Sequence, residues 1–147
     1  MHTRIPPPIV TFFFLAINYL VNLIFPQFKY STNILIGFLL ILLGMSILIY
    51  AAKEFKKVQT TINPMSPDKA SYLVTSGPFN ISRNPMYLGM VFIILGSGIS
   101  FGALLTPIFI VSFMIYITVF QIIPEEKVMS QKFTEWSDYS KKTRRWL

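Results

Sequence analysis

The sequence contains no cysteine, only one histidine and few charged residues. Without cysteine the chain can form no disulfide, no thiolate metal site, no iron–sulfur cluster and no thiolate nucleophile. The single histidine is His2, beside the N-terminus, so neither histidine general-base chemistry nor a histidine-bound metal is expected. Charged residues make up 13% of the 147 residues, whereas 53% are hydrophobic. This composition predicts one membrane-embedded domain, because a soluble domain carries about twice that charged share.

Four apolar segments hold most of the hydrophobic residues, and each predicts a helix because lipid offers no partner to an unpaired backbone group. They run from Pro8 to Phe25, Asn33 to Ala52, Tyr87 to Phe101 and Leu104 to Ile123. The link between the last two is so short that it predicts an antiparallel hairpin. The tail after Pro124 has the pattern of an amphipathic helix at a membrane surface. The predicted fold class is an all-α integral membrane protein with about four transmembrane helices, a short C-terminal helical hairpin and an interfacial C-terminal helix.

The net charge of +7 is distributed unevenly. Eleven of the thirteen lysines and arginines, and all six acidic residues, lie in the segments 53–83 and 125–145. With four spans both segments share one side of the membrane, and their positive charge predicts the cytoplasmic side of the cell (inner) membrane. In a soluble protein such a charge would suggest nucleic acid, but here it favours membrane lipids as partners. We expect no nucleic-acid partner and no bound metal.

The motif Gly96–Ser97–Gly98 lies inside the third apolar segment. A dinucleotide-binding loop would need a strand before it, and no strand is expected there. Small residues in a membrane helix usually let a second helix approach closely. The motif therefore predicts close helix packing.

The stretch SRNPMYLG, from Ser82 to Gly89, places polar residues directly before the third apolar segment. Pro85 suits the first position of a helix, and Asn84 before it is a good capping residue. Taken alone, Arg83 is an ordinary cationic anchor and Tyr87 an ordinary interfacial aromatic. Together they predict a polar entrance to the third helix.

Two adjacent carboxylates, Glu125 and Glu126, follow Pro124, and Gln121 lies one helical turn earlier. If the fourth helix ends here, the carboxylates lie at the unfavourable negative end of the helix dipole. If Pro124 instead begins a new helix, they lie in its favourable first turn. In either case an acidic pair near the bilayer indicates a functional site with a cationic partner.

These features resemble the isoprenylcysteine carboxyl methyltransferase family of integral membrane enzymes, to which the phospholipid N-methyltransferases are related. The matching residues are LVTSGPF (Leu73 to Phe79), SRNPMYLG, the pair Glu125–Glu126 and the closing RRWL, in an order and spacing that extend from Thr60 to the C-terminus. The resemblance implies a pocket for S-adenosylmethionine at the cytosolic face. It divides the single domain, 1–147, into an N-terminal helix pair (1–58) and a cofactor-binding core (59–147).

The resemblance also implies roles for individual residues. The cofactor-binding residues would be Tyr72, Leu73, Val74, Phe79, Asn84, Pro85, Met86, Tyr87 and Glu125. The candidate catalytic residues are Arg83 and Glu126. Gln121 is the candidate substrate-binding residue, because eukaryotic members carry an arginine there that is thought to meet the substrate carboxylate. Glutamine cannot neutralise a carboxylate, so a lipid-like amine, thiol or hydroxyl fits at least as well.

The implied activity is methyl transfer from S-adenosylmethionine to a lipophilic substrate that enters from the bilayer, similar to O-methylation of an isoprenylcysteine carboxylate. A carboxylate is a natural partner for the sulfonium and ammonium of this cofactor. Methyl transfer of this kind depends mainly on alignment and on exclusion of water, so it needs no cysteine and no histidine. The alternatives are a methyltransferase for a phospholipid or a small lipophilic amine or thiol, and a non-enzymatic membrane scaffold or transporter subunit.

Overall fold

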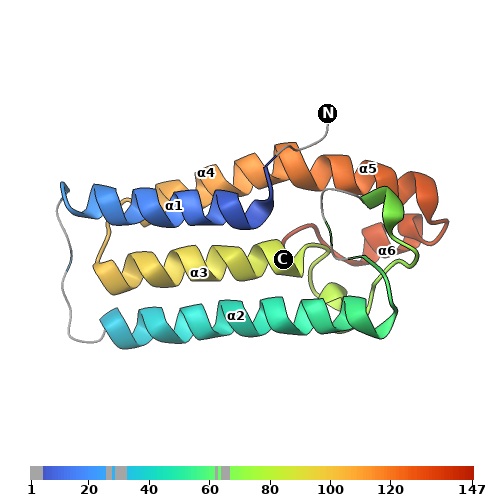
Figure 1. Ribbon diagram of the computed structural model, residues 1–147, viewed down its shortest axis with the longest axis horizontal. Helices are drawn as coiled ribbons and strands as arrows, with labels where there is room; N and C mark the ends of the chain where they lie inside the picture. Colours follow the sequence, from blue (N-terminus) through green and yellow to red (C-terminus); the bar gives the residue numbers. More distant parts are fainter. Residues whose placement is uncertain (1–4, 26–27, 29–32, 62, 64–66) are drawn as a thin grey trace.

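The computed structural model describes residues 5–25, 28, 33–61, 63 and 67–147, and the regular elements of that part are helices (Figure 1). The long helices are α1 (Pro7–Asn22), α2 (Asn33–Lys57), α3 (Pro85–Phe101) and α4 (Thr106–Ile117). A π-helical turn (Thr118–Ile122) joins α4 directly to α5 (Ile123–Lys132), and a short helix α6 (Trp136–Lys142) follows. Two 3-10 turns, Pro67–Lys69 and Gly77–Asn80, lie in the segment between α2 and α3.

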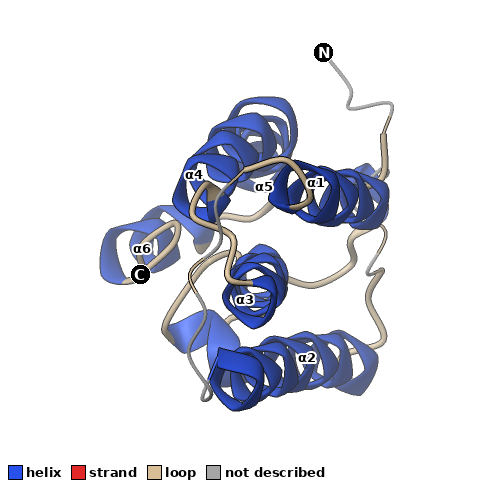
Figure 2. Ribbon diagram, turned by 90° about the vertical axis from the view of Figure 1, so that its left-hand side faces the viewer, coloured by secondary structure: helices blue, strands red, loops and turns tan. Residues whose placement is uncertain are grey.

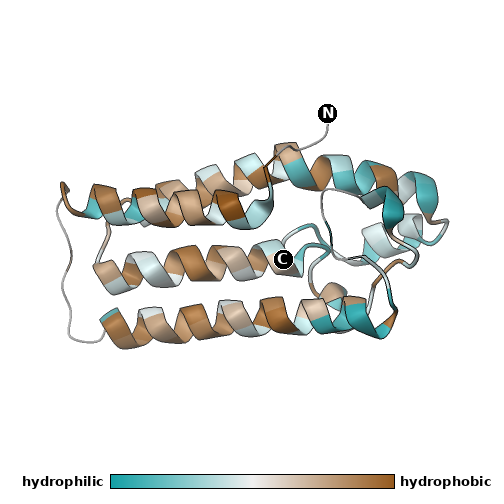
Figure 3. Cartoon of the chain, in the orientation of Figure 1, coloured by the Kyte–Doolittle hydropathy of each residue, from teal (hydrophilic) through white to brown (hydrophobic). Residues whose placement is uncertain are grey.

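The helices α1 to α4 lie side by side, with α3 at the centre of the bundle (Figures 1 and 2). Helix α3 packs against α2 on one side and against α1 and α4 on the other. The polar residues gather at one end of this bundle, around α5, α6 and the segment between α2 and α3 (Figure 3). The grouping of polar chemistry at one end therefore matches the distribution of charge along the sequence.

Helices α2 and α3 approach one another closely at two glycine pairs. A Cβ atom on Gly37 would overlap the carbonyl oxygen of Gly96, and one on Gly44 would overlap the carbonyl oxygen of Gly89. The two glycines of each helix are seven residues apart, Gly37 and Gly44 on α2 and Gly89 and Gly96 on α3. This equal spacing is expected for two antiparallel helices in one register. At the other edge of α3, Gly98 lies against the side chain of Thr106. The structure thus confirms the predicted role of the Gly96–Gly98 motif in close packing.

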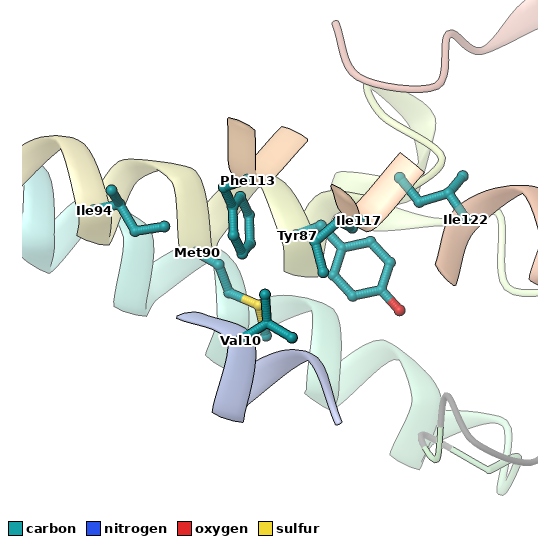
Figure 4. Packing of buried hydrophobic residues seen from close by; sticks show 7 residues of the cluster. All are labelled: Val10, Tyr87, Met90, Ile94, Phe113, Ile117 and Ile122. Carbon is teal, nitrogen blue, oxygen red and sulfur yellow. The ribbon is translucent and has the colours of Figure 1, made fainter. Parts of the chain in front are cut away.

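The apolar core lies between α1, α3 and α4. Its buried members are Val10, Tyr87, Met90, Ile94, Phe113, Ile117 and Ile122 (Figure 4). The ring of Tyr87 belongs to this cluster, while its hydroxyl points out of it (Figure 4). Large apolar side chains also cover the outside of the bundle, with Phe12 75% and Ile34 72% exposed. Such continuous apolar exposure suits lipid better than water.

Two helices of the described residues are long and apolar enough to cross a membrane: Asn33–Lys57 with 25 residues and Thr106–Lys132 with 27. Helices α1 and α3 are apolar but have only 16 and 17 residues. At 1.5 Å per residue they are about 25 Å long, less than a hydrocarbon core of about 30 Å. These two candidate spans are fewer than the four expected from the sequence, because α1 already ends at Asn22 and α3 covers only Pro85–Phe101.

The C-terminal part differs from the sequence-based expectation. The fourth helix neither ends at Ile123 nor restarts at Pro124, since the π turn continues it to Lys132. Proline lacks the N–H that a regular helix uses, and the wider turn lies immediately before it, where the N–H of Ile123 bonds to the carbonyl of Thr118. The single amphipathic helix expected after Pro124 is two helices, because Phe133 has an extended backbone with φ −117° and ψ 120°.

Candidate functional site

A cavity of about 240 Å³ lies at the polar end of the bundle. Its wall comes from the first residues of α1 and α3, the last turns of α2, described residues of the segment between α2 and α3, and helices α5 and α6. All nine residues expected to bind a cofactor line this wall: Tyr72, Leu73, Val74, Phe79, Asn84, Pro85, Met86, Tyr87 and Glu125. Arg83 and Glu126 line it as well. The structure therefore brings together residues that lie more than fifty positions apart in the sequence.

The centre of the site is a hydrogen bond between two helices. The hydroxyl of Tyr87, on α3, donates to Oε1 of Glu125, on α5, over 2.7 Å. The side-chain amide of Gln121 donates to the same oxygen from the π turn. Within the described part of the chain, no lysine or arginine forms an ion pair with Glu125. The cavity wall thus contains a carboxylate that is held by neutral donors only.

The neighbouring carboxylate, Glu126, has the opposite environment. Its Oε1 accepts from Nε and Nη2 of Arg83 over 3.1 and 2.9 Å, and its Oε2 accepts from Nη2 of Arg145 over 2.6 Å. The hydrogen bond to Glu126 also raises the pKa of Arg145. With Arg83 and Glu126 only 13% and 15% exposed, this ion-pair cluster is largely shielded from solvent. Glu126 is neutralised by the protein itself.

The guanidinium of Arg83 donates hydrogen bonds to protein groups on both of its sides. Besides its two bonds to Glu126, its Nη1 donates to the carbonyls of Ser140 and Thr143, both over 2.7 Å. The guanidinium carbon also lies 5.8 Å from the centre of the Trp136 ring, a cation–π distance. The catalytic role that the resemblance implies for Arg83 therefore stays a prediction, while the observed bonds make Arg83 the link between α3, α5 and the tail.

The C-terminal tail runs beside the entrance of α3. The N–H of Arg83 donates to the carbonyl of Arg144 over 2.9 Å, and the side-chain amide of Asn84 donates to the carbonyl of Arg145 over 2.9 Å. Ser82 donates to the same carbonyl over 3.3 Å. The expected capping role of Asn84 is therefore wrong, because its side chain makes no bond to the start of α3 and holds the tail instead.

Two further parts of the expected helix start are observed. Helix α3 begins at Pro85, as expected from its fixed φ angle. The hydroxyl of Ser82 accepts the N–H of Asn84 over 3.1 Å, which satisfies a backbone donor ahead of the helix. At the far end of the tail, the indole N–H of Trp146 donates to the hydroxyl of Thr118 over 3.3 Å. The tail is therefore tied to both α3 and the π turn.

Glu54 is a structural residue of the site that the sequence analysis missed. It is 3% exposed, forms an ion pair with Lys57 and accepts a hydrogen bond from the hydroxyl of Ser76 over 2.5 Å. Gly77, with φ +60°, lies directly against it, so a side chain there would be strained and crowded. Glu54 thereby holds the segment that carries the wall residues Leu73 to Phe79. Its position as an acidic residue in the last turns of an apolar helix is the signal that would have found it.

The same segment is fixed from the other side by Tyr139 of α6. Its hydroxyl donates to the carbonyl of Phe79 over 2.8 Å. Burial raises the pKa of Tyr139, so the hydroxyl keeps its proton and remains a donor. The wall is consequently anchored to both α2 and α6.

Gln121 does not line the cavity. Its side chain is 1% exposed and bonds to Glu125 from within the protein. The expected contact between Gln121 and a substrate is therefore not favoured by this geometry. No cluster of three or more metal-binding side chains occurs among the residues that the structure describes.

The side chains that line the cavity suit a ligand that is cationic at one point and apolar elsewhere. The partly exposed carboxylate of Glu125 would accept the cationic group. Val74, Phe79 and Met86 offer an apolar wall for a flat ring system. S-adenosylmethionine, with its sulfonium, ammonium and adenine, matches these features in chemical terms.

Comparison with known proteins agrees with the geometry. Residues 32–135 match the family model described as phospholipid methyltransferase, a segment that includes α2, α3, the wall residues from Thr61 to Met129 and the acidic pair. No curated protein and no solved structure matches the chain. Together with the two long apolar helices, the family match indicates a membrane protein with methyltransferase activity. The resemblance to the membrane methyltransferases is thus confirmed, and the chain belongs to the phospholipid methyltransferase family.

Proposed function

We propose that the protein transfers a methyl group from S-adenosylmethionine to the polar end of a lipophilic acceptor. The observation that carries this proposal is Glu125, whose carboxylate lines the cavity without an ion-pair partner among the described residues. A carboxylate that is only partly exposed and lies beside apolar residues is costly unless a cation compensates it. The sulfonium or ammonium of the methyl donor would supply that cation.

The remaining wall residues would hold the rest of the donor. Val74, Phe79 and Met86 would enclose the adenine, and Tyr87 would keep Glu125 in place. The N–H groups of Arg83 already bond to Glu126 and to the carbonyls of Ser140 and Thr143. The first turn of α3 is therefore the better candidate to bind the carboxylate of S-adenosylmethionine, because the N-terminus of a helix favours an anion. When bound, the cofactor supplies an electrophilic methyl group and departs as a neutral thioether.

The chain's own contribution is alignment and exclusion of water. The two anchors of the wall, Glu54 on α2 and Tyr139 on α6, hold the segment 73–79 in place without a ligand. A preformed site reduces the entropy that the reactants must lose, an effect that can contribute several kcal/mol to catalysis. An amine acceptor would react in its neutral form and, once methylated, release one proton to water, so this mode of catalysis requires none of the residue types that the sequence lacks.

The acceptor that the site favours is a lipid amine. The resemblance to prenylcysteine enzymes implies a carboxylate acceptor, similar to the one in isoprenylcysteine O-methylation. However, Arg83 and Arg145 both bond to Glu126, and Gln121 lies off the wall, so the described wall offers no free cation for such a carboxylate. The phospholipid methyltransferase match favours the amine in the same way.

We further propose that the acceptor reaches the cavity from the bilayer and that the active face is cytoplasmic. Pro7 and Pro8 of α1 and Phe55 of α2 line the cavity together, with Met90 of α3 between them. An alkyl chain would enter along this apolar edge while the cofactor enters from the water. In this arrangement all four long helices span the membrane, with the cavity end tilted or recessed to accommodate the shorter α1 and α3.

The test is product identification with a methyl-labelled donor. Membranes that contain the protein are incubated with labelled S-adenosylmethionine, and the lipid, protein and small-molecule fractions are counted separately. We expect label in the lipid fraction, and its loss in Glu125→Gln, which removes the charge but keeps the size of the side chain. The exposed variant Ser112→Ala is the matched control, since its hydroxyl bonds only within its own helix.

Other outcomes of this experiment identify the competing functions. Label in prenylated protein would favour the carboxylate acceptor. Absence of label in every fraction, together with absence of donor binding that unlabelled donor displaces, would contradict the proposal and favour a non-enzymatic membrane scaffold or transporter subunit.

A further inference from the structure

Gln121 is a buried polar residue whose role the proposed function leaves open. It lies on the π turn between α4 and α5 and is 1% exposed. Its amide donates to Oε1 of Glu125, one helical turn further on. Tyr87 donates to the same oxygen from α3. Two neutral donors from two different elements therefore converge on one oxygen of this carboxylate.

The second oxygen of Glu125 has a different environment. No described residue bonds to Oε2 of Glu125, although the residue lines the cavity. In Glu126 both oxygens are occupied by arginine donors, since Oε1 accepts from Arg83 and Arg145 and Oε2 accepts from Arg145. The two adjacent carboxylates thus differ: both oxygens of Glu126 accept hydrogen bonds from the protein, whereas Oε2 of Glu125 remains available to a ligand.

The chemical nature of Gln121 suits this arrangement. An amide donates a hydrogen bond without carrying a charge, so it fixes the carboxylate but leaves its negative charge uncompensated. An arginine at the same place would form an ion pair with Glu125 and remove the attraction for a cation in the cavity. The residue type therefore matters as much as the contact.

We infer that Gln121 is a positioning residue, which with Tyr87 fixes Oε1 of Glu125 and thereby presents Oε2 to the cationic group of the methyl donor. This inference rests on the proposed function. It replaces the direct substrate contact that the family resemblance implies for Gln121. On this inference Gln121 acts through Glu125, and the acceptor does not touch it.

Two substitutions separate the hydrogen bond from the charge. Gln121→Met keeps the length of the side chain and removes the donor. Gln121→Lys keeps a donor and adds a positive charge that would pair with Glu125. Asn18→Leu is the matched control, because Asn18 is an equally buried amide at the opposite end of the bundle, where it accepts a hydrogen bond from Thr106.

The measurement is titration calorimetry of the full chain in detergent with S-adenosylmethionine, combined with thermal unfolding and with the KM for the lipid acceptor. We expect Gln121→Met to weaken donor binding about tenfold, the effect of losing one hydrogen bond to a charged group. Gln121→Lys should weaken it further, because its ammonium competes with the donor for Glu125. The acceptor KM should stay unchanged in both, and Asn18→Leu should leave donor binding unchanged.

Each other result has a distinct meaning. If the wild type binds the donor and Gln121→Met binds it equally well, the inference about Gln121 is overturned while the proposed function stands. If the acceptor KM rises and donor affinity does not, Gln121 contacts the acceptor and the inference is again overturned. If donor binding falls only in proportion to a lost folded fraction, the role is structural and not positional. If the wild type does not bind the donor, the proposed function fails, and the inference fails with it.

Discussion

Two regions of the bundle are held together by different forces: the shaft, which is the apolar part of α1 to α4 away from the cavity, and the polar end, which contains the cavity. Along the shaft, α2 and α3 pack at two glycine pairs, and the outer faces of the helices are apolar. At the polar end, the contacts are hydrogen bonds and ion pairs between segments that are far apart in the sequence, such as Arg83 and Glu126. The shaft resembles a membrane helix pair, where small residues permit close approach. The polar end resembles a soluble site, where charge-assisted hydrogen bonds determine the geometry.

This difference shows how one short chain can contain both a lipid-exposed body and a cofactor-sized cavity. Packing in the shaft is distributed over many weak contacts, so no single apolar side chain dominates it. The polar end depends on a few groups, each of which has several partners. The largest single effect should therefore come from a polar-end group with several partners, and the following predictions compare the two regions from the largest expected effect to the smallest.

The largest effect is expected for Arg83→Met. The substitution leaves Glu126 with one arginine and removes the donors of two buried carbonyls, so the free energy of unfolding should fall by about 3 to 5 kcal/mol. Unfolding in detergent measures the loss, and trypsin cleavage at Lys141 or Lys142 reports release of the tail. The control is Lys53→Met, an exposed lysine on the same side, which should change stability by less than about 0.5 kcal/mol. Equal stabilities of the two variants would contradict a structural role for the ion-pair cluster.

A smaller loss is expected for Gly44→Leu in the shaft. The new side chain would overlap the backbone of Gly89, so α2 and α3 must separate, and the free energy of unfolding should fall by about 2 to 3 kcal/mol. Met45→Leu, on the exposed face of the same helix, keeps the volume and should be close to neutral. Donor affinity per folded molecule should stay the same, because Gly44 lies outside the cavity wall. A shaft variant that binds donor more weakly would show that the two regions are coupled.

Tyr139→Phe should have a more modest effect at the polar end. It leaves the buried carbonyl of Phe79 without its donor, and the free energy of unfolding should fall by about 1 to 2 kcal/mol. The matched control is Tyr19→Phe, a half-exposed tyrosine at the other end of the bundle. If both variants lose the same stability, the hydrogen bond from Tyr139 does not anchor the wall.

The smallest effect concerns pH. Because burial raises the pKa of Tyr139 in the folded protein, the unfolded chain ionises this hydroxyl first, at about pH 10. The contribution of Tyr139 to stability is complete below that pH and is lost as the pH rises toward the folded pKa. Between about pH 9 and pH 11, the wild type should therefore lose about 1 kcal/mol more stability than Tyr139→Phe. Parallel pH curves for the two proteins would show that Tyr139 is not protected by burial.

Much of the shaft was predictable because a helix in lipid depends on consecutive residues. The third helix was expected to end at Phe101, as it does, and Gly96 was expected to allow close packing. The second helix extends to Lys57, beyond the expected end at Ala52, because its last turns are polar and pack Glu54 against the cavity wall. The prediction of a single helix after Pro124 was wrong for a similar reason. The extended backbone of Phe133 interrupts the helix, and the tail then returns to the start of α3.

Half of the cavity wall was predictable as a set of residues, but the bonds of its polar members and the contributions of α1, α2 and α6 were not. The motif from Ser82 to Gly89 and the acidic pair indicated which residues would converge. The partner of each side chain followed from distances that only the folded chain defines. Asn84 looked like a cap and holds Arg145, and Arg83 looked like a ligand contact and holds Glu126.

By itself, the sequence determined the helical class, the concentration of polar residues at one end and the family, because these depend on composition, on local order and on motif spacing. The tertiary structure alone decided the register of α2 on α3 and the division of labour between Glu125 and Glu126. The physical reason is the range of the interactions. Backbone hydrogen bonds in a helix join residues four apart, whereas the bond between Tyr87 and Glu125 joins residues 38 apart and exists only where two helices meet.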